Sequence, residues 1–131
     1  PPGTGDEPLS VVQTAKPDGA IIVTTPQEVA TFDVRKSIDF CNKLELPVIG
    51  VIENMSGFIC PHCNKETAIF STCGGKRMAE ELGIAFLGAI PIDPQFVSSS
   101  DQGNPMIDFT TSGKSIEAIK MIIDKIAHKH E

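Results

Sequence analysis

Two cysteines in the run Cys60-Pro61-His62-Cys63 are the residues whose types and spacing point most directly to chemistry. A C-x-x-C pair can close a redox-active disulfide, hold half of a zinc site, or supply half of the ligands of an iron–sulfur cluster. Each of these answers implies a different kind of protein. The pair alone does not choose between them, so the rest of the chain has to.

The number of thiol donors limits the metal sites that the sequence can form. A tetrahedral zinc ion or a four-iron cluster needs four protein ligands or an equivalent, and the chain has one C-x-x-C pair. A two-fold symmetric dimer would supply the second pair, because an isologous interface presents the same patch twice. Alternatively, Cys73 could join a zinc site within one chain, which would make residues 57–73 a zinc-clipped structural loop. His62 is a poor fourth ligand because it lies between two ligating neighbours.

The redox interpretation also has a precedent, since C-P-H-C occurs as an active-site sequence in thiol oxidants of the thioredoxin class. There the first cysteine sits at a helix N-terminus, where the helix dipole lowers the thiol pKa. Here Cys63 is followed by "NKETAIFSTCGG", which lacks a helical apolar period and predicts a short hairpin or loop. The sequence therefore makes a thiol-disulfide oxidoreductase the less favoured alternative.

Three further motifs carry polar groups that suit a nucleotide. The backbone N–H groups of residues 3–5 could approach a phosphate, although a rigid turn before a short helix explains the same residues. Asn54 could donate and accept along the edge of an adenine ring, or it could satisfy a turn after a strand. Pro91 and Asp93 follow another apolar run, where Asp93 could instead cap a short helix.

These motifs are positioned by alternating strands and helices. Buried strands are predicted by the apolar runs of residues 19–26, 47–54 and 85–91, and helices are predicted over residues 26–44, 74–83 and 112–129. The first strand is predicted to be buried on both faces. Thr25 is placed to cap the helix that follows it. This alternation indicates an α/β fold with a mostly parallel sheet and flanking helices, and a cysteine-containing hairpin or loop insertion.

Two of the predicted helices carry apolar side chains that should face the core. In the last helix, the isoleucines at positions 116, 119, 123 and 126 recur at helical spacing. Cys41, on the helix over residues 26–44, is predicted to be a buried small hydrophobe.

In open parallel sheets ligands bind outside the carboxyl ends of the strands, and all of the motifs above fall at that edge.

Composition bounds the remaining possibilities. The 131 residues, 40% of them hydrophobic, predict a single domain with a real core. A net charge of −6 without a Lys/Arg block argues against nucleic-acid binding, and the absence of a long apolar run argues against a membrane span. A cytoplasmic location is the default expectation. Pro1 and the loop-like "PPGTGD" lead us to expect a fragment of a longer domain.

Taken in order, several motifs together closely resemble the carboxy-terminal half of the Mrp/ApbC family. They are "PPGTGDEPLS", "GAIIVTTPQEVA", "VIGVIENMSGF", "CPHC", "GGKRMAEELG" and "IPIDPQFVSSSDQGNP". The family comprises P-loop ATPases of the deviant Walker A class, related to MinD and the nitrogenase iron protein, that carry iron–sulfur clusters. The resemblance covers nearly all of the chain, so it implies that residues 1–131 form the C-terminal part of a P-loop NTPase domain.

The resemblance also implies a role for each motif. Cys60 and Cys63 would supply half of the ligands of a cluster, most simply a 4Fe-4S cluster, that bridges a homodimer and is passed to apo client proteins. Asn54 would contact adenine, with Pro91 and Asp93 in the loop that closes over the base. The switch segment that senses the γ-phosphate of ATP with its Mg²⁺ would comprise Gly3, Thr4, Gly5 and Asp6. No residue of this chain is assigned a catalytic role.

Two departures from the family pattern matter. The sequence contains no G-x-x-x-x-G-K-[ST], since its Gly-Gly-Lys at residues 74–76 is not preceded by a strand. A polypeptide of these 131 residues is therefore expected not to hydrolyse ATP, because nothing in it cradles the β- and γ-phosphates. Cys73 lies outside the family pattern, which keeps the three-cysteine zinc site open as an alternative.

Overall fold

The computed structural model describes residues 5–60, 62–63, 65–103 and 113–128. It has an α/β architecture in the order α1 (Asp6–Ala15), β1 (Ala20–Thr24), α2 (Glu28–Lys43), β2 (Val48–Ile59), β3 (Glu66–Thr67), α3 (Gly74–Glu81), β4 (Phe86–Ile92), α4 (Pro94–Asp101) and α5 (Lys114–Ala127). β2 pairs in parallel with both β1 and β4, and its distal end pairs antiparallel with β3. The predicted α/β class with a mostly parallel sheet is confirmed.

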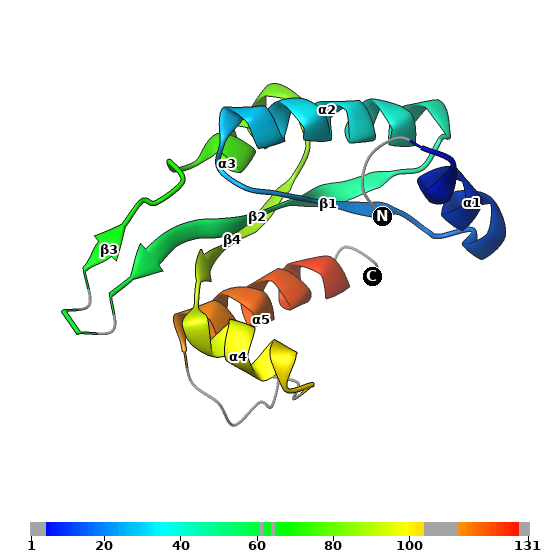
Figure 1. Ribbon diagram of the computed structural model, residues 1–131. Coiled ribbons are helices and arrows are strands. Elements are labelled where there is room, and N and C mark those ends of the chain that lie inside the picture. The colour runs from blue at the N-terminus through cyan, green and yellow to red at the C-terminus, as the bar shows by residue number, and fades with distance from the viewer. Residues whose placement is uncertain (1–4, 61, 64, 104–112, 129–131) are drawn as a thin grey trace.

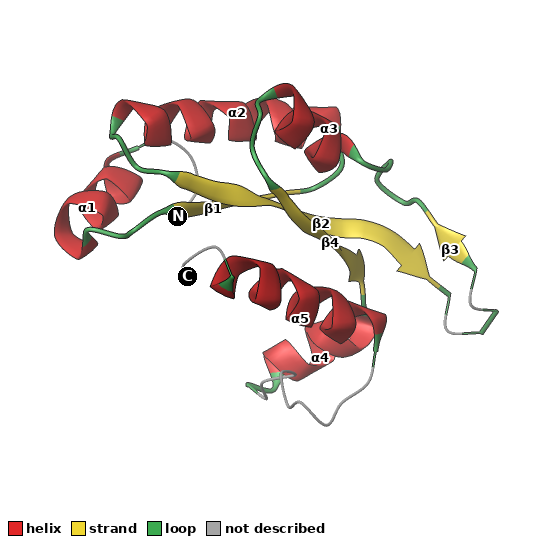
Figure 2. Ribbon diagram, turned by 180° about the vertical axis from the view of Figure 1, so that it is seen from behind, coloured by secondary structure: helices red, strands yellow, loops and turns green. Residues whose placement is uncertain are grey.

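Helices cover both faces of this sheet (Figures 1 and 2). α2 and α3 lie on one face, and α5 lies against β4 on the other, with α4 beside it. The core between the sheet and the helices contains Val51 from β2, Leu87 from β4 and Met78 from α3, all of which are almost completely buried. Cys41 on α2 is buried with them, as predicted.

The start of α2 differs from the prediction. The helix begins at Glu28, with Gln27 in the N-cap position, and not at residue 26. Thr25 does not cap it, because its hydroxyl donates to the side chain of Gln27 at 3.1 Å. Pro26 is buried just before the helix, where its carbonyl packs against Gly74 at the start of α3. Tertiary packing at this point displaced the local capping pattern.

The phase of α5 also differs in one position from the predicted stripe. Ile116 and Ile122 are buried, whereas Ile123 is 44% exposed. Ile122 lies against Gly88 of β4, where a Cβ on the glycine would come within 2.7 Å of its side chain. The close approach that Gly88 permits decides which of two adjacent isoleucines enters the core.

The second strand is much longer than predicted. β2 runs to Ile59 and not to residue 54, so it carries the chain directly to Cys60. Its register with β4 is irregular between Asn54 and Phe58, and Met55 and Gly57 in that stretch have positive φ angles of 57° and 84°. Beyond this irregularity β2 and β3 project from the body of the molecule as a two-stranded hairpin (Figure 1). The hairpin predicted after the cysteine pair is thus formed with the strand that precedes it.

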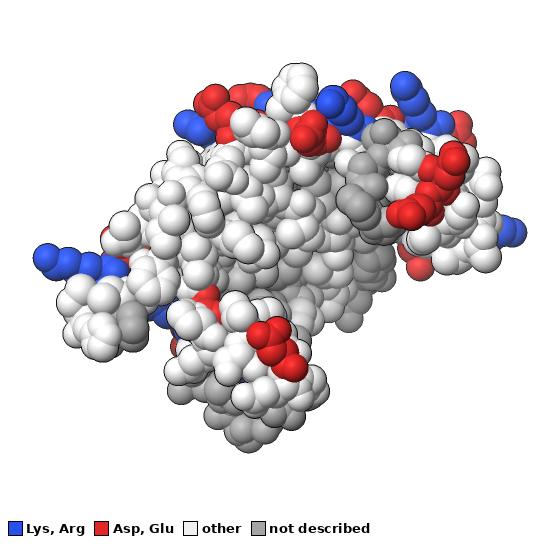
Figure 3. Space-filling view, viewed as in Figure 1, with Lys and Arg blue, Asp and Glu red and all other residues white. Residues whose placement is uncertain are grey.

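The first strand is not buried on both faces, contrary to the prediction. Ile22 and Thr24 are buried, but Ile21 is 39% and Val23 is 56% exposed. Lys, Arg, Asp and Glu gather over α2 and around α1, whereas the centre of the face seen in Figure 3 carries few charges. Across the described ranges, no helix is long and apolar enough to span a membrane.

Candidate functional site

The two cysteines of the C-x-x-C pair lie at the far end of the projecting hairpin. Cys60 directly follows β2 and is half-buried, and its backbone N–H donates to the carbonyl of Lys65 at 3.0 Å, which closes the hairpin. Cys63 is exposed in the connection between the strands, as is His62. Both thiols are therefore free and placed where another molecule can reach them.

The local hydrogen bonds favour a thiolate at Cys60. The backbone N–H of His62 donates to its sulfur, and the backbone and thiol of Cys63 also contribute, so the pKa of Cys60 is lowered below the ordinary thiol value. The thiol interaction means that the sulfur atoms of Cys60 and Cys63 already face each other. This arrangement suits a metal ligand, because metals bind the thiolate form.

The other two cysteines do not join this pair. Cys41 is buried on α2, where desolvation raises its pKa and leaves it a protonated, inert thiol. Cys73 is exposed at the N-cap of α3 in a left-handed conformation, with φ of 60°. In the part of the chain that the structure describes, no group of three or more His, Cys, Asp or Glu residues could hold a metal ion. A three-cysteine zinc site within one chain is therefore not formed among these residues.

Of the predicted adenine-binding residues, Pro91 and Asp93 lie at the carboxyl end of β4, whereas Asn54 lies in the middle of β2, where its register with β4 becomes irregular. Pro91 and Asp93 line a pocket of about 300 Å³ together with Lys114 and Ser115 at the start of α5. The Asp93 carboxylate accepts from the backbone N–H of Gln95 at 2.9 Å and so caps α4. Asn54 is not in the lining of this pocket; its side-chain oxygen accepts from the N–H of Met55 at 2.9 Å. Asp93 thus caps α4, as its alternative interpretation predicted, whereas Asn54 lies within β2 and not in a turn after the strand.

The predicted switch segment lies elsewhere in the fold. Gly3 and Thr4 are outside the described residues. Gly5 forms the N-cap of α1 and Asp6 is its first residue, both exposed. α1 lies at the end of the molecule opposite the cysteine hairpin (Figures 1 and 2), so these residues are not brought together with Cys60 and Cys63.

The structure contains a buried acidic residue that the sequence analysis did not single out. Glu53, on β2 next to Asn54, is only 1% exposed. One of its carboxylate oxygens accepts from the hydroxyl of Ser56 at 2.5 Å and the other from the backbone N–H of Gly75 at 2.7 Å. The available signal was a glutamate that directly follows the apolar run "VIGVI", since acidic residues are rarely buried without partners.

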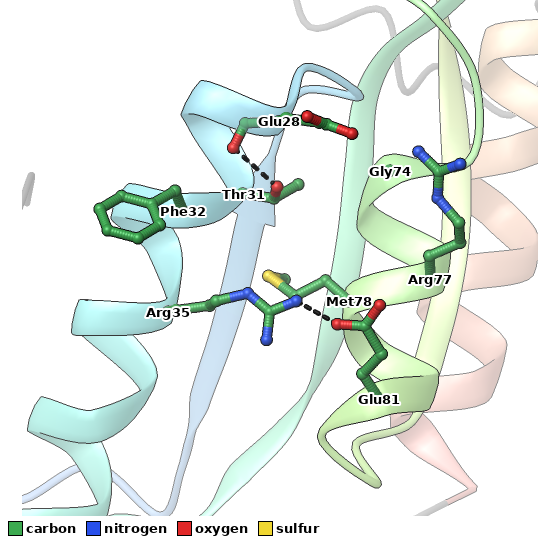
Figure 4. Close-up of a pocket in the computed structure, with 8 residues that line it drawn as sticks. All are labelled: Glu28, Thr31, Phe32, Arg35, Gly74, Arg77, Met78 and Glu81. Carbon is green, nitrogen blue, oxygen red and sulfur yellow. Dashed lines mark hydrogen bonds and ion pairs between the residues drawn. The ribbon is translucent and has the colours of Figure 1, made fainter.

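A second pocket, of about 400 Å³, lies between α2 and α3. Figure 4 shows Arg35 from α2 reaching across to form an ion pair with Glu81 from α3, with Met78 beneath them. Phe32 on the rim is 64% exposed, and the ammonium of Lys36 lies 5.2 Å from its ring centroid. The residues that line this pocket carry both signs of charge and include no cysteine, and the hydroxyl of Thr31 among them donates to the carbonyl of Glu28 at 2.9 Å, so the pocket does not compete with the cysteine pair as a thiol site.

Solved structures define the class of protein to which this fold belongs. A nucleotide-binding protein from Archaeoglobus fulgidus, solved in complex with ADP, superposes with a TM-score of 0.72 at 38% identity and covers 88% of this chain and 50% of that one. The cell division ATPase MinD from Pyrococcus furiosus superposes with a TM-score of 0.64 at 18% identity, covering 86% and 43%. The fold is that of the MinD-like P-loop NTPases.

Sequence comparison narrows this class to a family. Residues 1–127 match the ParA family in the profile described as the NUBPL iron-transfer P-loop NTPase, and the chain belongs to this family. An iron–sulfur cluster carrier protein from Methanocaldococcus jannaschii is 50% identical over 134 residues, covering 100% of this chain and 46% of the relative. A cytosolic Fe-S cluster assembly factor NUBP2 homologue from Nematostella vectensis is 47% identical over 131 residues, covering 98% and 48%. The chain spans about half the length of the curated relatives it matches.

Proposed function

We propose that this chain is the cysteine-bearing part of an iron–sulfur cluster carrier, and that Cys60 and Cys63 bind the cluster it carries. The supporting observation is the pair itself: two accessible, mutually facing thiols at the end of a projecting hairpin, with the pKa of Cys60 lowered. Soft thiolates of this kind suit iron–sulfur clusters and zinc alike. Membership of a family whose relatives are named as cluster carriers and assembly factors favours the cluster.

Two thiols per chain meet half of the need of a four-iron cluster, so we propose that two copies share one cluster. A two-fold interface at the hairpins would bring two C-x-x-C pairs together, and hairpins that project from the body can meet without a clash of the cores. A shared, solvent-accessible cluster is also suited to release, because it is held at a subunit boundary and not inside one fold. Apo iron–sulfur proteins are the clients that we propose for such a cluster.

For a protein of the length of the curated relatives, we propose that ATP with Mg²⁺ binds beside Pro91 and Asp93 and that its hydrolysis changes the dimer geometry. Asn54 and Cys60 both belong to the β2 region, at the start of the register irregularity and just beyond the end of the strand. Ile59, the last residue of β2, lines the same pocket as Pro91 and Asp93. A change at the nucleotide therefore has a short route to the cysteines. Gly3, Thr4, Gly5 and Asp6 are proposed as the segment that responds to the γ-phosphate.

The test is anaerobic reconstitution with iron and sulfide of the parent chain, a Cys60→Ala/Cys63→Ala variant, and a Cys73→Ser variant as the matched control. Visible absorption, iron and sulfide content, and oligomer mass are measured on each. We expect one cluster per two chains in the parent and in Cys73→Ser, and none in the double variant. Metal bound within a monomer, or a strict need for Cys73, would contradict the shared cluster. Reduction of insulin by the metal-free chain would favour the oxidoreductase alternative.

A further inference from the structure

Glu53 is a buried acidic residue that has no part in the proposed cluster binding. A buried carboxylate is costly unless its charge and its oxygens are satisfied. Glu53 makes no ion pair with any described residue, yet Ser56 and Gly75 together donate to both of its oxygens. Gly75 lies in the first turn of α3, so the carboxylate also faces the positive end of that helix dipole.

The two partners of Glu53 lie on either side of one stretch of chain. Ser56 immediately precedes residues 57–73, which we call the cysteine segment, and Gly75 follows it by two residues. The segment contains Cys60, Cys63 and Cys73. A single side chain from the core therefore holds both ends of the segment, which would otherwise close only at an entropic cost.

The backbone at both ends is shaped to reach this carboxylate. Ser56 lies between Met55 and Gly57, two residues with positive φ, in the stretch where β2 leaves its register with β4. At the other end, a Cβ on Gly75 would lie 3.1 Å from the carboxylate oxygen of Glu53 and 2.9 Å from the side chain of Thr24. The bulge redirects the strand and the glycine permits the close approach, so both features serve the same contact.

We propose that Glu53 is the positioning residue of the cysteine segment: it clamps the entry and the exit of the segment to the core and so sets the direction in which Cys60 and Cys63 are presented. Its effect on metal binding rests on the proposed function, whereas its effect on the hairpin does not. Residues that hydrogen-bond to a metal ligand, without binding the metal themselves, change metal affinity by roughly 10-fold to 100-fold when they are removed. Glu53 acts at longer range, so the lower figure is the expectation.

The experiment compares Ser56→Ala, Glu53→Ala and Glu53→Gln with the parent chain, and uses Ser100→Ala as the matched control. The Ser100 hydroxyl also donates one hydrogen bond, to the carbonyl of Phe96, but within α4. Two readouts are taken: Co²⁺ affinity, followed by thiolate-to-cobalt charge-transfer absorption, and amide hydrogen exchange over residues 58–60 and 65–67. The first needs a metal at the cysteines, and the second does not.

We expect Ser56→Ala to weaken Co²⁺ binding roughly 10-fold and to speed exchange in the hairpin. Glu53→Ala should have the larger effect because it releases both ends. Glu53→Gln should be closest to the parent, because its amide oxygen can still accept from Gly75 and its amide nitrogen can donate to the oxygen of Ser56. Ser100→Ala should match the parent in both readouts.

Several outcomes decide the question. Parent-like Co²⁺ affinity and hairpin exchange in both alanine variants would overturn the proposal, as would faster exchange spread evenly over β1 and α2, because that indicates a general loss of stability. If Glu53→Ala does not fold, Ser56→Ala carries the test. If the parent binds no Co²⁺, the proposed function fails, and hydrogen exchange alone decides the role of Glu53.

Discussion

The two ends of β2 differ in what surrounds them. Up to Glu53 the strand lies between β1 and β4, with Val51 and Glu53 almost fully buried beneath α2 and α3. From Phe58 onward it extends beyond β1: Phe58 still pairs with Ile92 at the end of β4, and the distal end pairs with the two residues of β3. One continuous strand thus joins a part held by packing to a part held by a few backbone hydrogen bonds.

The packed end and the projecting end of β2 therefore suit different roles. The packed end is held in a fixed position, because its neighbours have little room to move. The projecting end can open locally at a lower free energy than global unfolding. A cysteine pair that received and released a cluster, as we propose, would be expected on the second kind of structure. The contacts of Glu53 lie where the packed end of β2 joins the projecting end.

The largest expected effect comes from a glycine at the packed end. A Cβ on Gly74 would lie 2.0 Å from the carbonyl oxygen of Pro26, which is backbone and cannot move aside. We expect Gly74→Ala to cost about 3 kcal/mol in the free energy of unfolding, and therefore to lower the melting temperature by about 10 °C. Thermal unfolding followed by circular dichroism measures this.

Two other glycines serve as comparisons for this experiment. Gly57, in the hairpin, has φ of 84° and faces the flexible side chain of Glu66, so Gly57→Ala should cost about 1–2 kcal/mol locally. That loss should appear as faster amide exchange in the hairpin, with little change in the melting temperature. Gly83→Ala, with positive φ and open space around it, controls for backbone strain alone. Equal melting temperatures for Gly74→Ala and Gly83→Ala would contradict the packing argument.

The same contrast explains what the sequence could predict. Strands and helices of the packed end follow from periodicity, because burial on a helix face or a strand face repeats at a fixed interval. The extension of β2 through "MSGFI" was missed because Met55, Ser56 and Gly57 interrupt the apolar run with a bulge. Cys60 and Cys63 lie only three positions apart in the sequence and were found as candidates. The contact between Glu53 and Gly75 joins residues 22 positions apart and depends on tertiary packing, which no local pattern encodes.

A pH-dependent prediction addresses the projecting end. The pKa of Cys60 is lowered in the folded chain, chiefly by the backbone N–H of His62. Its alkylation by iodoacetamide, followed by peptide mass spectrometry, should therefore reach half-maximal rate at a lower pH in the native chain than in urea. Because the folded-state pKa is the lower one, the associated stabilisation is present above the unfolded pKa and is lost as pH falls through the folded pKa.

The control for this titration is Cys63→Ala, which removes the neighbouring thiol but leaves the larger contribution from the His62 N–H. Most of the downward displacement should remain in that variant. In the parent chain, the lowered pKa of Cys60 should also make metal binding begin at a lower pH than in an unfolded C-x-x-C peptide, because metals compete with protons for the thiolate. Coincident alkylation profiles in buffer and in urea would show that the hairpin does not hold Cys60 in the described geometry.

The smallest expected effect concerns the ion pair between Arg35 and Glu81, which links α2 to α3 over the packed end. Their side chains are 36% and 60% exposed, so solvent and salt screen the attraction. A double-mutant cycle with Arg35→Ala, Glu81→Ala and the double variant should give a coupling energy of about 0.5 kcal/mol that falls in high salt. If α2 and α3 are held by Met78 and the glycines beneath them, the pair adds little. A coupling above about 2 kcal/mol, insensitive to salt, would mean that surface charge and not packing fixes α3, and with it the exit of the cysteine segment.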